Sequence, residues 1–151
     1  MNTCIDMLRH TRRHLLSILE DLSMDQLNDT PSGFNNNIVW NVSHMIASQQ
    51  GVCYKRAGVP LIIPESFFME YKPDTRPERY IDANEFQQTK ETFLSSLDVL
   101  ERDYNNNLFK NYIPWTTRYG VPLANIDETL QFLVFHEGLH FGYVMALRHL
   151  V

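Results

Sequence analysis

Hydrophobic positions recur at intervals of three and four residues over most of this 151-residue chain, as helices that bury one face require. The pattern predicts four long helices, over residues 3–22, 36–56, 82–104 and 125–151. No strand-like alternation occurs between them. We therefore expect an all-α fold, a four-helix bundle formed by residues 1–151 as a single domain.

Polar residues and prolines mark where the predicted helices begin and where the chain must leave them. Residue pairs typical of helix starts are Thr3 with Asp6, Asp82 with Glu85, and Asn125 with Glu128, and Asn36 or Asn37 can cap the second helix. Residues 58–80 contain four prolines, which exclude a continuous helix there. This segment is long enough to be a crossover between the second and third helices.

Composition and charge narrow the possible functions. The chain has 13 basic and 18 acidic residues, a net charge of −5, so no overall basic field attracts nucleic acid. Arg9, Arg12 and Arg13 form a small basic cluster that we interpret as a solvated helix face. Cys4 and Cys53 are far apart and form no CxxC pair, which argues against disulfides and for a cytoplasmic protein. We expect no signal peptide and no membrane span, because no apolar run is long enough.

The candidate chemistry lies in the fourth helix, where residues 132–147 read FLVFHEGLHFGYVMAL. His136 and His140 are four residues apart, so a helix points both imidazoles to one side. Imidazoles in so apolar a segment are costly unless a partner satisfies them, and a metal ion would do so. Glu137 lies about 100° around the helix from His136. It is therefore a candidate catalytic residue, as a proton acceptor or as a group that orients a ligand, or it is only a flanking charge.

Three interpretations of these histidines are open. HEGLH matches the HExxH motif of zinc peptidases with Glu137 as general base, but the longer peptidase pattern fails at Tyr143 and Ala146. Alternatively, His44 supplies a third imidazole from among small residues in the second helix. Three histidines with an open coordination position suit zinc, nickel or iron(II). In the third interpretation the histidines are core residues that bind no metal.

The segment NIVWNVSHMIAS around His44, followed near the C-terminus by HEGLHFGYVMALRHL, resembles the DinB/YfiT-like superfamily. The order of the helices and the long second connection agree with this family as well. The resemblance implies a four-helix bundle, often homodimeric, in which His44, His136 and His140 bind a divalent metal. It also implies a metal-dependent hydrolase or a thiol-dependent S-transferase. Phe141 and Gly142 stand where some relatives have an arginine or another polar residue.

These observations lead to one hypothesis and one alternative. We expect a zinc or nickel ion, or iron, on the three histidines to activate water or a low-molecular-weight thiol toward a small-molecule substrate. Trp40 and Tyr143 each lie one turn from a ligand, and we expect them to line the substrate pocket. We also expect a homodimer with neither nucleic acid nor membrane as a partner. The alternative is a non-catalytic, metal-stabilised bundle that acts as a binding or stress-response module.

Overall fold

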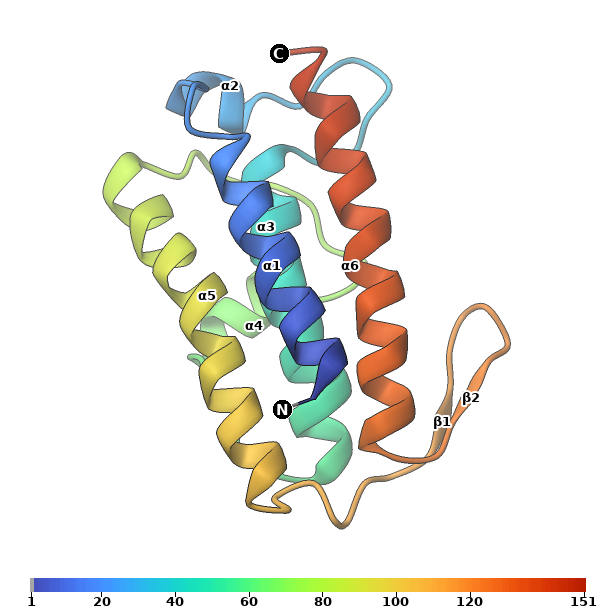
Figure 1. The fold of residues 1–151 in the computed structure, drawn as a ribbon. Coiled ribbons are helices and arrows are strands. Elements are labelled where there is room, and N and C mark those ends of the chain that lie inside the picture. Colours follow the sequence, from blue (N-terminus) through green and yellow to red (C-terminus); the bar gives the residue numbers. More distant parts are fainter. Residues whose placement is uncertain (1) are drawn as a thin grey trace.

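The computed structural model describes residues 2–151, and most of them are helical (Figure 1). The helices are α1 (Thr3–Ser17), α2 (Met24–Asn28), α3 (Ile38–Gln49), α4 (Glu65–Tyr71), α5 (Ala83–Asn105) and α6 (Ile126–Arg148). A π-helical turn (Gln50–Tyr54) and a 3-10 turn (Lys55–Ala57) extend α3. The strands β1 (Trp115–Thr116) and β2 (Pro122–Leu123) form a small antiparallel hairpin. Apart from this hairpin, the predicted all-α class fits the structure.

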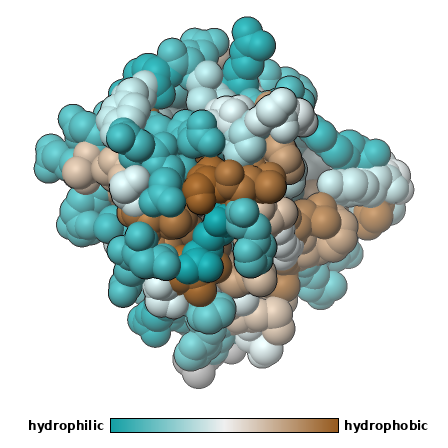
Figure 2. Space-filling model, turned by 90° about the horizontal axis from the view of Figure 1, so that it is seen from above, coloured by the Kyte–Doolittle hydropathy of each residue, from teal (hydrophilic) through white to brown (hydrophobic). Residues whose placement is uncertain are grey.

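The four long helices α1, α3, α5 and α6 lie side by side, and α1 and α3 each pack against both α5 and α6 (Figure 1). The hairpin lies beside the N-terminal end of α6 (Figure 1). Figure 2 looks onto the opposite end, which carries α2 and the C-terminus. That end is mostly hydrophilic, with hydrophobic side chains gathered near its centre. No helix in residues 2–151 combines the length and apolar composition that crossing a membrane requires.

Side-chain caps fix three helix starts at predicted positions. Asn37, Asp82 and Asn125 each accept a hydrogen bond from the backbone N–H three residues later, at 2.8, 2.8 and 3.0 Å respectively. These bonds satisfy N–H groups that have no partner within the helix. The sequence-based predictions of these starts are therefore confirmed.

Other local predictions are wrong. Helix α1 is capped by Asn2, whose side chain accepts two backbone hydrogen bonds, and not by Thr3. It ends at Ser17, earlier than predicted, and the short helix α2 follows it. Residues 58–80 form no continuous helix, as predicted, but they do contain the short helix α4, which fits between the prolines of that segment. Short helices of this kind depend on tertiary packing, which a local hydrophobic pattern does not reveal.

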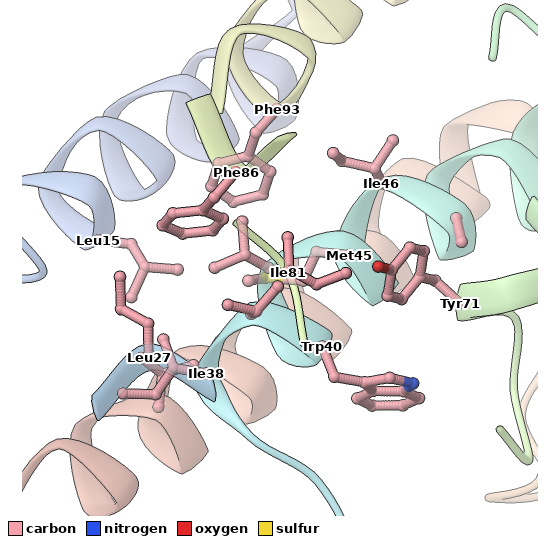
Figure 3. Close-up of a cluster of buried hydrophobic side chains, with 14 of the residues drawn as sticks. Leu15, Leu27, Ile38, Trp40, Met45, Ile46, Tyr71, Ile81, Phe86 and Phe93 are labelled. Carbon is pink, nitrogen blue, oxygen red and sulfur yellow. The ribbon is translucent and has the colours of Figure 1, made fainter. Parts of the chain in front are cut away.

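Two clusters of buried hydrophobic side chains fill the space between the helices. The first, which includes Leu15, Leu27, Ile38, Met45, Phe86 and Phe93, lies toward α2 (Figure 3). The second includes Ile5, Leu8, Tyr54, Leu97, Leu100 and Leu130. Burial of each large side chain contributes about 1.5–3 kcal/mol to stability. Figure 3 shows Trp40 at the edge of the first cluster, on the far side from Phe86 and Phe93.

A layer of buried polar side chains separates the two clusters. Each long helix contributes one residue to it: Arg12, Gln49, Ser96 and Glu137. The Arg12 guanidinium donates to Glu137, to Gln49 and to Ser96, so the layer is hydrogen-bonded across all four helices. Such pairing is needed because an unpaired polar group in a core is strongly unfavourable.

Candidate metal-binding site

The three histidines that the sequence singled out come together between α3 and α6. One ring nitrogen from each of His44, His136 and His140 can be chosen so that all three lie within 4.8 Å of one another. The His136 and His140 ring centroids are 4.6 Å apart, and the His44 centroid lies 4.7 Å from that of His140. Two residues one turn apart on α6 thus meet a third residue from the middle of α3.

The hydrogen bonds of His44 determine which of its nitrogens can act as a ligand. Nδ1 lies 2.7 Å from the backbone carbonyl oxygen of Tyr71. A carbonyl can only accept, so Nδ1 carries the hydrogen and Nε2 keeps its lone pair. The Ser48 hydroxyl donates to Nε2 at 3.0 Å and can rotate away. The Trp40 indole stacks on the imidazole with a centroid distance of 4.5 Å, which holds the ring in place.

His140 is oriented in the same way by Asn41. The Asn41 side-chain nitrogen donates to the Asn37 carbonyl at 2.7 Å and to Asn36 Oδ1 at 2.9 Å. These two acceptors fix the amide, so its oxygen faces His140 Nδ1 at 2.8 Å and accepts a hydrogen bond from it. Nε2 of His140 therefore also keeps a free lone pair. Orientation of a ligand imidazole through its other nitrogen is characteristic of metal sites in proteins.

His136 differs, because its Nδ1 is buried and has no hydrogen-bond partner among the described residues. A buried ring nitrogen without a partner is unfavourable, and an ion bound at that nitrogen would satisfy it. Zinc–nitrogen bonds of about 2.0–2.1 Å place two ligand nitrogens at most about 4.2 Å apart. The observed cluster is close to that spacing. The donor set of three imidazoles thus fits zinc, nickel or iron(II).

Burial keeps all three imidazoles neutral. It is the main cause that lowers the pKa of His136 to about 3, and the neighbouring His140, His44 and Arg118 lower it further. Burial, His44 and Arg118 lower the pKa of His140 to about 4. The pKa of His44 is lowered by burial as well, although its bond to the Tyr71 carbonyl opposes the shift. Neutral imidazoles are the form that binds metal ions.

A cavity of about 890 Å³ opens onto the three histidines. Trp40 and Tyr143, the two residues expected in a substrate pocket, both line it. The small residues of α3 and its extension also line it, and α4 contributes Phe68. A Cβ atom built on Gly51 would lie 3.4 Å from the Phe68 ring, so the small-residue face is what lets α4 approach this closely.

Glu137 does not line the cavity, and its carboxylate faces Arg12 in the interior of the protein. Both of its carboxylate oxygens accept from the Arg12 guanidinium, and the side chains of Glu137 and Arg12 are only 4% and 1% exposed. The interpretation of Arg12 as part of a solvated face is therefore wrong. A signal was present in the sequence, because Arg12 follows Leu8 by four residues and precedes Leu15 by three, on the buried side of α1.

Sequence reasoning missed Asn41 and Arg118. Asn41 is fully buried within the apolar helix α3, and a polar amide in such a position was a usable signal. Arg118 lies in the hairpin turn and lines the cavity. Its place depends on how the hairpin packs, which local sequence does not determine.

The fold and the site define an all-helical protein with a three-histidine cluster that could hold a metal ion. The family model of the DinB superfamily matches residues 7–144, nearly the whole chain. The chain therefore belongs to the DinB superfamily, which confirms the resemblance seen in its histidine segments. A search of the curated proteins finds no match.

Proposed function

We propose that this chain is a metal-dependent enzyme, a hydrolase or a thiol-dependent S-transferase, with one divalent ion on His44, His136 and His140. The observation that carries the proposal is the open side of the histidine cluster. The cluster has three members among the described residues and faces a cavity of about 890 Å³. Structural zinc sites are usually closed by four protein ligands, whereas catalytic sites keep a position for water or substrate.

When bound, such an ion supplies Lewis acidity that activates water or a thiol near neutral pH. The residues of the chain do the rest. The Tyr71 carbonyl and the Asn41 amide orient two of the imidazoles. Trp40, held by a 3.1 Å hydrogen bond from its indole N–H to Thr75, and Tyr143 form walls that receive the substrate and limit access of bulk water. Glu137 positions α6 through Arg12 and takes no part as a general base.

We infer that α1, α3, α5 and α6 form the four-helix bundle expected from the sequence, with residues 58–80 as its crossover. The pairwise packing of these helices supports this, and so does the course of the chain between α3 and α5 (Figure 1). In this arrangement α3 and α6 are neighbours. A site built from both helices is then held rigidly by the two core clusters on either side of the buried polar layer.

A second copy of the chain is the partner we propose for α6. Phe135, which packs on Tyr119, and Leu139, which lies at the cavity, are one turn apart on this helix and still 51% and 46% exposed. Large apolar side chains left in water on one helix face favour association. Sedimentation velocity at micromolar concentration would show a dimer, and a monomer would refute this part of the proposal. The free cysteines, Cys4 and Cys53, support the expected cytoplasmic location.

Metal content of the purified protein tests the proposal directly. We expect one ion per chain by elemental analysis, and its loss in His44→Ala. His10→Ala is the matched control, since His10 is an exposed histidine of α1 that does not line the cavity. Full metal stoichiometry and affinity in His44→Ala would disprove the ligand set. A panel of hydrolysis and thiol-transfer assays on the metal-loaded protein then separates the two reaction classes.

The same assays separate an enzyme from a non-catalytic bundle. A protein that binds its ion but turns over no substrate in either assay class would support the binding or stress-response module. Closure of the ion by a fourth protein ligand, seen in X-ray absorption spectra as a filled coordination shell, would support it as well. The open cavity beside the histidines favours the enzyme.

A further inference from the structure

Arg118 lines the cavity, and its charged side chain has no partner among the described residues. Within residues 2–151 its side chain makes no hydrogen bond and no ion pair. Each of the two other cations that line the cavity has a partner in the protein, although for Arg56 this partner is an aromatic ring and not a hydrogen bond or an ion pair. Lys55 pairs with Glu65 at 3.1 Å, and the Arg56 guanidinium lies 4.7 Å from the centre of the Trp115 ring. Arg118 is therefore available to bind an anion.

Aromatic contacts hold the hairpin that carries Arg118 against α6. Trp115 meets Phe132 edge to face with ring centroids 5.8 Å apart, and Tyr119 meets Phe135 in the same way at 5.5 Å. A backbone hydrogen bond of 2.9 Å closes the turn between the strands. Arg118 lies between the two anchored rings in sequence. Its place at the cavity is thus set by packing, although the side chain itself is exposed.

The cavity is locally positive in a protein of net charge −5. Its charged lining residues, among those the structure describes, are Lys55, Arg56 and Arg118 against a single carboxylate, Asp74. Arg118 and the three histidines line the same cavity. A cavity of this sign attracts anions and raises their local concentration.

We propose that Arg118 binds a carboxylate of the substrate, and that the substrates are small monoanionic carboxylates with an apolar or aromatic body. This inference rests on the proposed function, since it names the substrate class of the same site. A guanidinium presents parallel N–H donors that match the two oxygens of a carboxylate. The rings of Trp40, Trp115, Phe132 and Tyr143 receive the body. One guanidinium without a partner in the protein balances one negative charge, which favours a monoanion over a phosphate of nearly two charges.

Both tryptophans of the chain line the cavity, so intrinsic fluorescence reports binding there. The probes are hydrocinnamate, its neutral analogue hydrocinnamide, and phenethylphosphonate, each titrated into the protein as purified. Arg118→Gln removes the charge and keeps hydrogen-bonding capacity. Arg13→Gln is the matched control, because Arg13 is an exposed arginine of α1 away from the cavity.

Hydrocinnamate should bind about two- to fivefold more tightly than hydrocinnamide, as expected for one partly exposed ion pair. Arg118→Gln should abolish this preference and Arg13→Gln should retain it. The inference is overturned if hydrocinnamate fails to bind, if both probes bind equally, or if phenethylphosphonate binds more tightly than hydrocinnamate. A preference that survives in Arg118→Gln also overturns it, because the carboxylate is then bound by another group.

Metal content measured on the same samples separates this inference from the proposed function. A metal-bearing protein without the carboxylate preference contradicts the role of Arg118 alone. A protein without metal that still shows an Arg118-dependent preference contradicts the proposed function, and the anion site stands. Arg118→Gln should leave the metal stoichiometry unchanged, since Arg118 is not one of the three histidine ligands.

Discussion

Arg12 and Glu137 form an ion pair in the interior of the protein although they are 125 residues apart in the sequence. Arg12 Nε lies 3.0 Å from one carboxylate oxygen of Glu137, and Nη2 donates to the other. Glu137 directly follows His136. The ion pair therefore fixes the rotation of α6 about its axis, and that rotation decides whether His136 and His140 face α3.

Removing one partner of this pair should strongly destabilise the protein. Glu137→Leu leaves the guanidinium of Arg12 buried without its counter-charge, which costs about 3–5 kcal/mol. Urea denaturation followed by circular dichroism measures the free energy of unfolding. The double variant Arg12→Met with Glu137→Leu should recover most of the loss, because apolar side chains of similar volume can replace a buried pair. If Glu137→Leu is as stable as the wild type, the pair does not hold the helices.

The double variant also tests whether Glu137 acts as a base. If the pair only positions α6, the double variant should bind metal and keep substantial activity. A catalytic Glu137 would instead make the double variant inactive while its stability is recovered. In that case the double variant would regain the stability of the wild type but not its activity.

The hydrophobic pattern predicted the long helices, and one of the three interpretations of the histidines brought all three together, for physical reasons. Side chains such as Asn37, Asp82 and Asn125 cap a helix through local hydrogen bonds, so sequence near each start is enough. The spacing of His136 and His140 is likewise a local property of a helix. His44 could be chosen as their partner because it lies among small residues of an otherwise apolar helix.

Long-range pairing was not predictable in this way. The partner of Glu137 is Arg12, and nothing near either residue in sequence indicates the other. The hairpin carrying Arg118 contains only two-residue strands, which are too short to leave an alternating pattern. Its aromatic residues pack on α6, and that contact becomes visible only once the chain is folded.

The metal-free protein should lose stability as the pH falls from about 6.5 toward 4. The pKa of His136 is lowered from 6.5 to about 3, and that of His140 to about 4, mainly by burial. In this range the unfolded chain binds protons that the folded state does not, so stability rises with pH and falls on acidification. Urea denaturation of chelator-treated protein across this range measures the slope.

A variant without these two imidazoles is the control for the pH effect. His136→Leu with His140→Leu should show a shallower slope over the same range, because two of the groups that take up protons only on unfolding are gone. An equal slope in the double variant and the wild type would assign the effect to other groups.

Asn41 should support metal affinity without touching the ion. Asn41→Leu removes the acceptor of the His140 Nδ1–H, so the ring loses the bond that orients Nε2. Loss of such a partner typically weakens metal affinity by about 10–100-fold. Competition with a chromophoric chelator measures the affinity. Ser43→Ala is the control, because the buried Ser43 hydroxyl has no hydrogen-bond partner among the described residues, so its removal should leave affinity unchanged.

Two glycine substitutions should change stability in opposite directions. Gly120, in the hairpin turn, has a φ of +79°, which L-residues adopt at a cost of about 1–2 kcal/mol. Gly120→Ala should therefore destabilise the hairpin and weaken any binding that depends on Arg118. Gly138 is an exposed residue within α6, and a Cβ there would meet no heavy atom within 4 Å. Gly138→Ala should stabilise the protein by about 0.5–1 kcal/mol, because alanine loses less backbone entropy in a helix. Thermal unfolding of both variants measures the difference. If Gly120→Ala leaves both stability and hydrocinnamate binding unchanged, the turn does not determine where Arg118 lies.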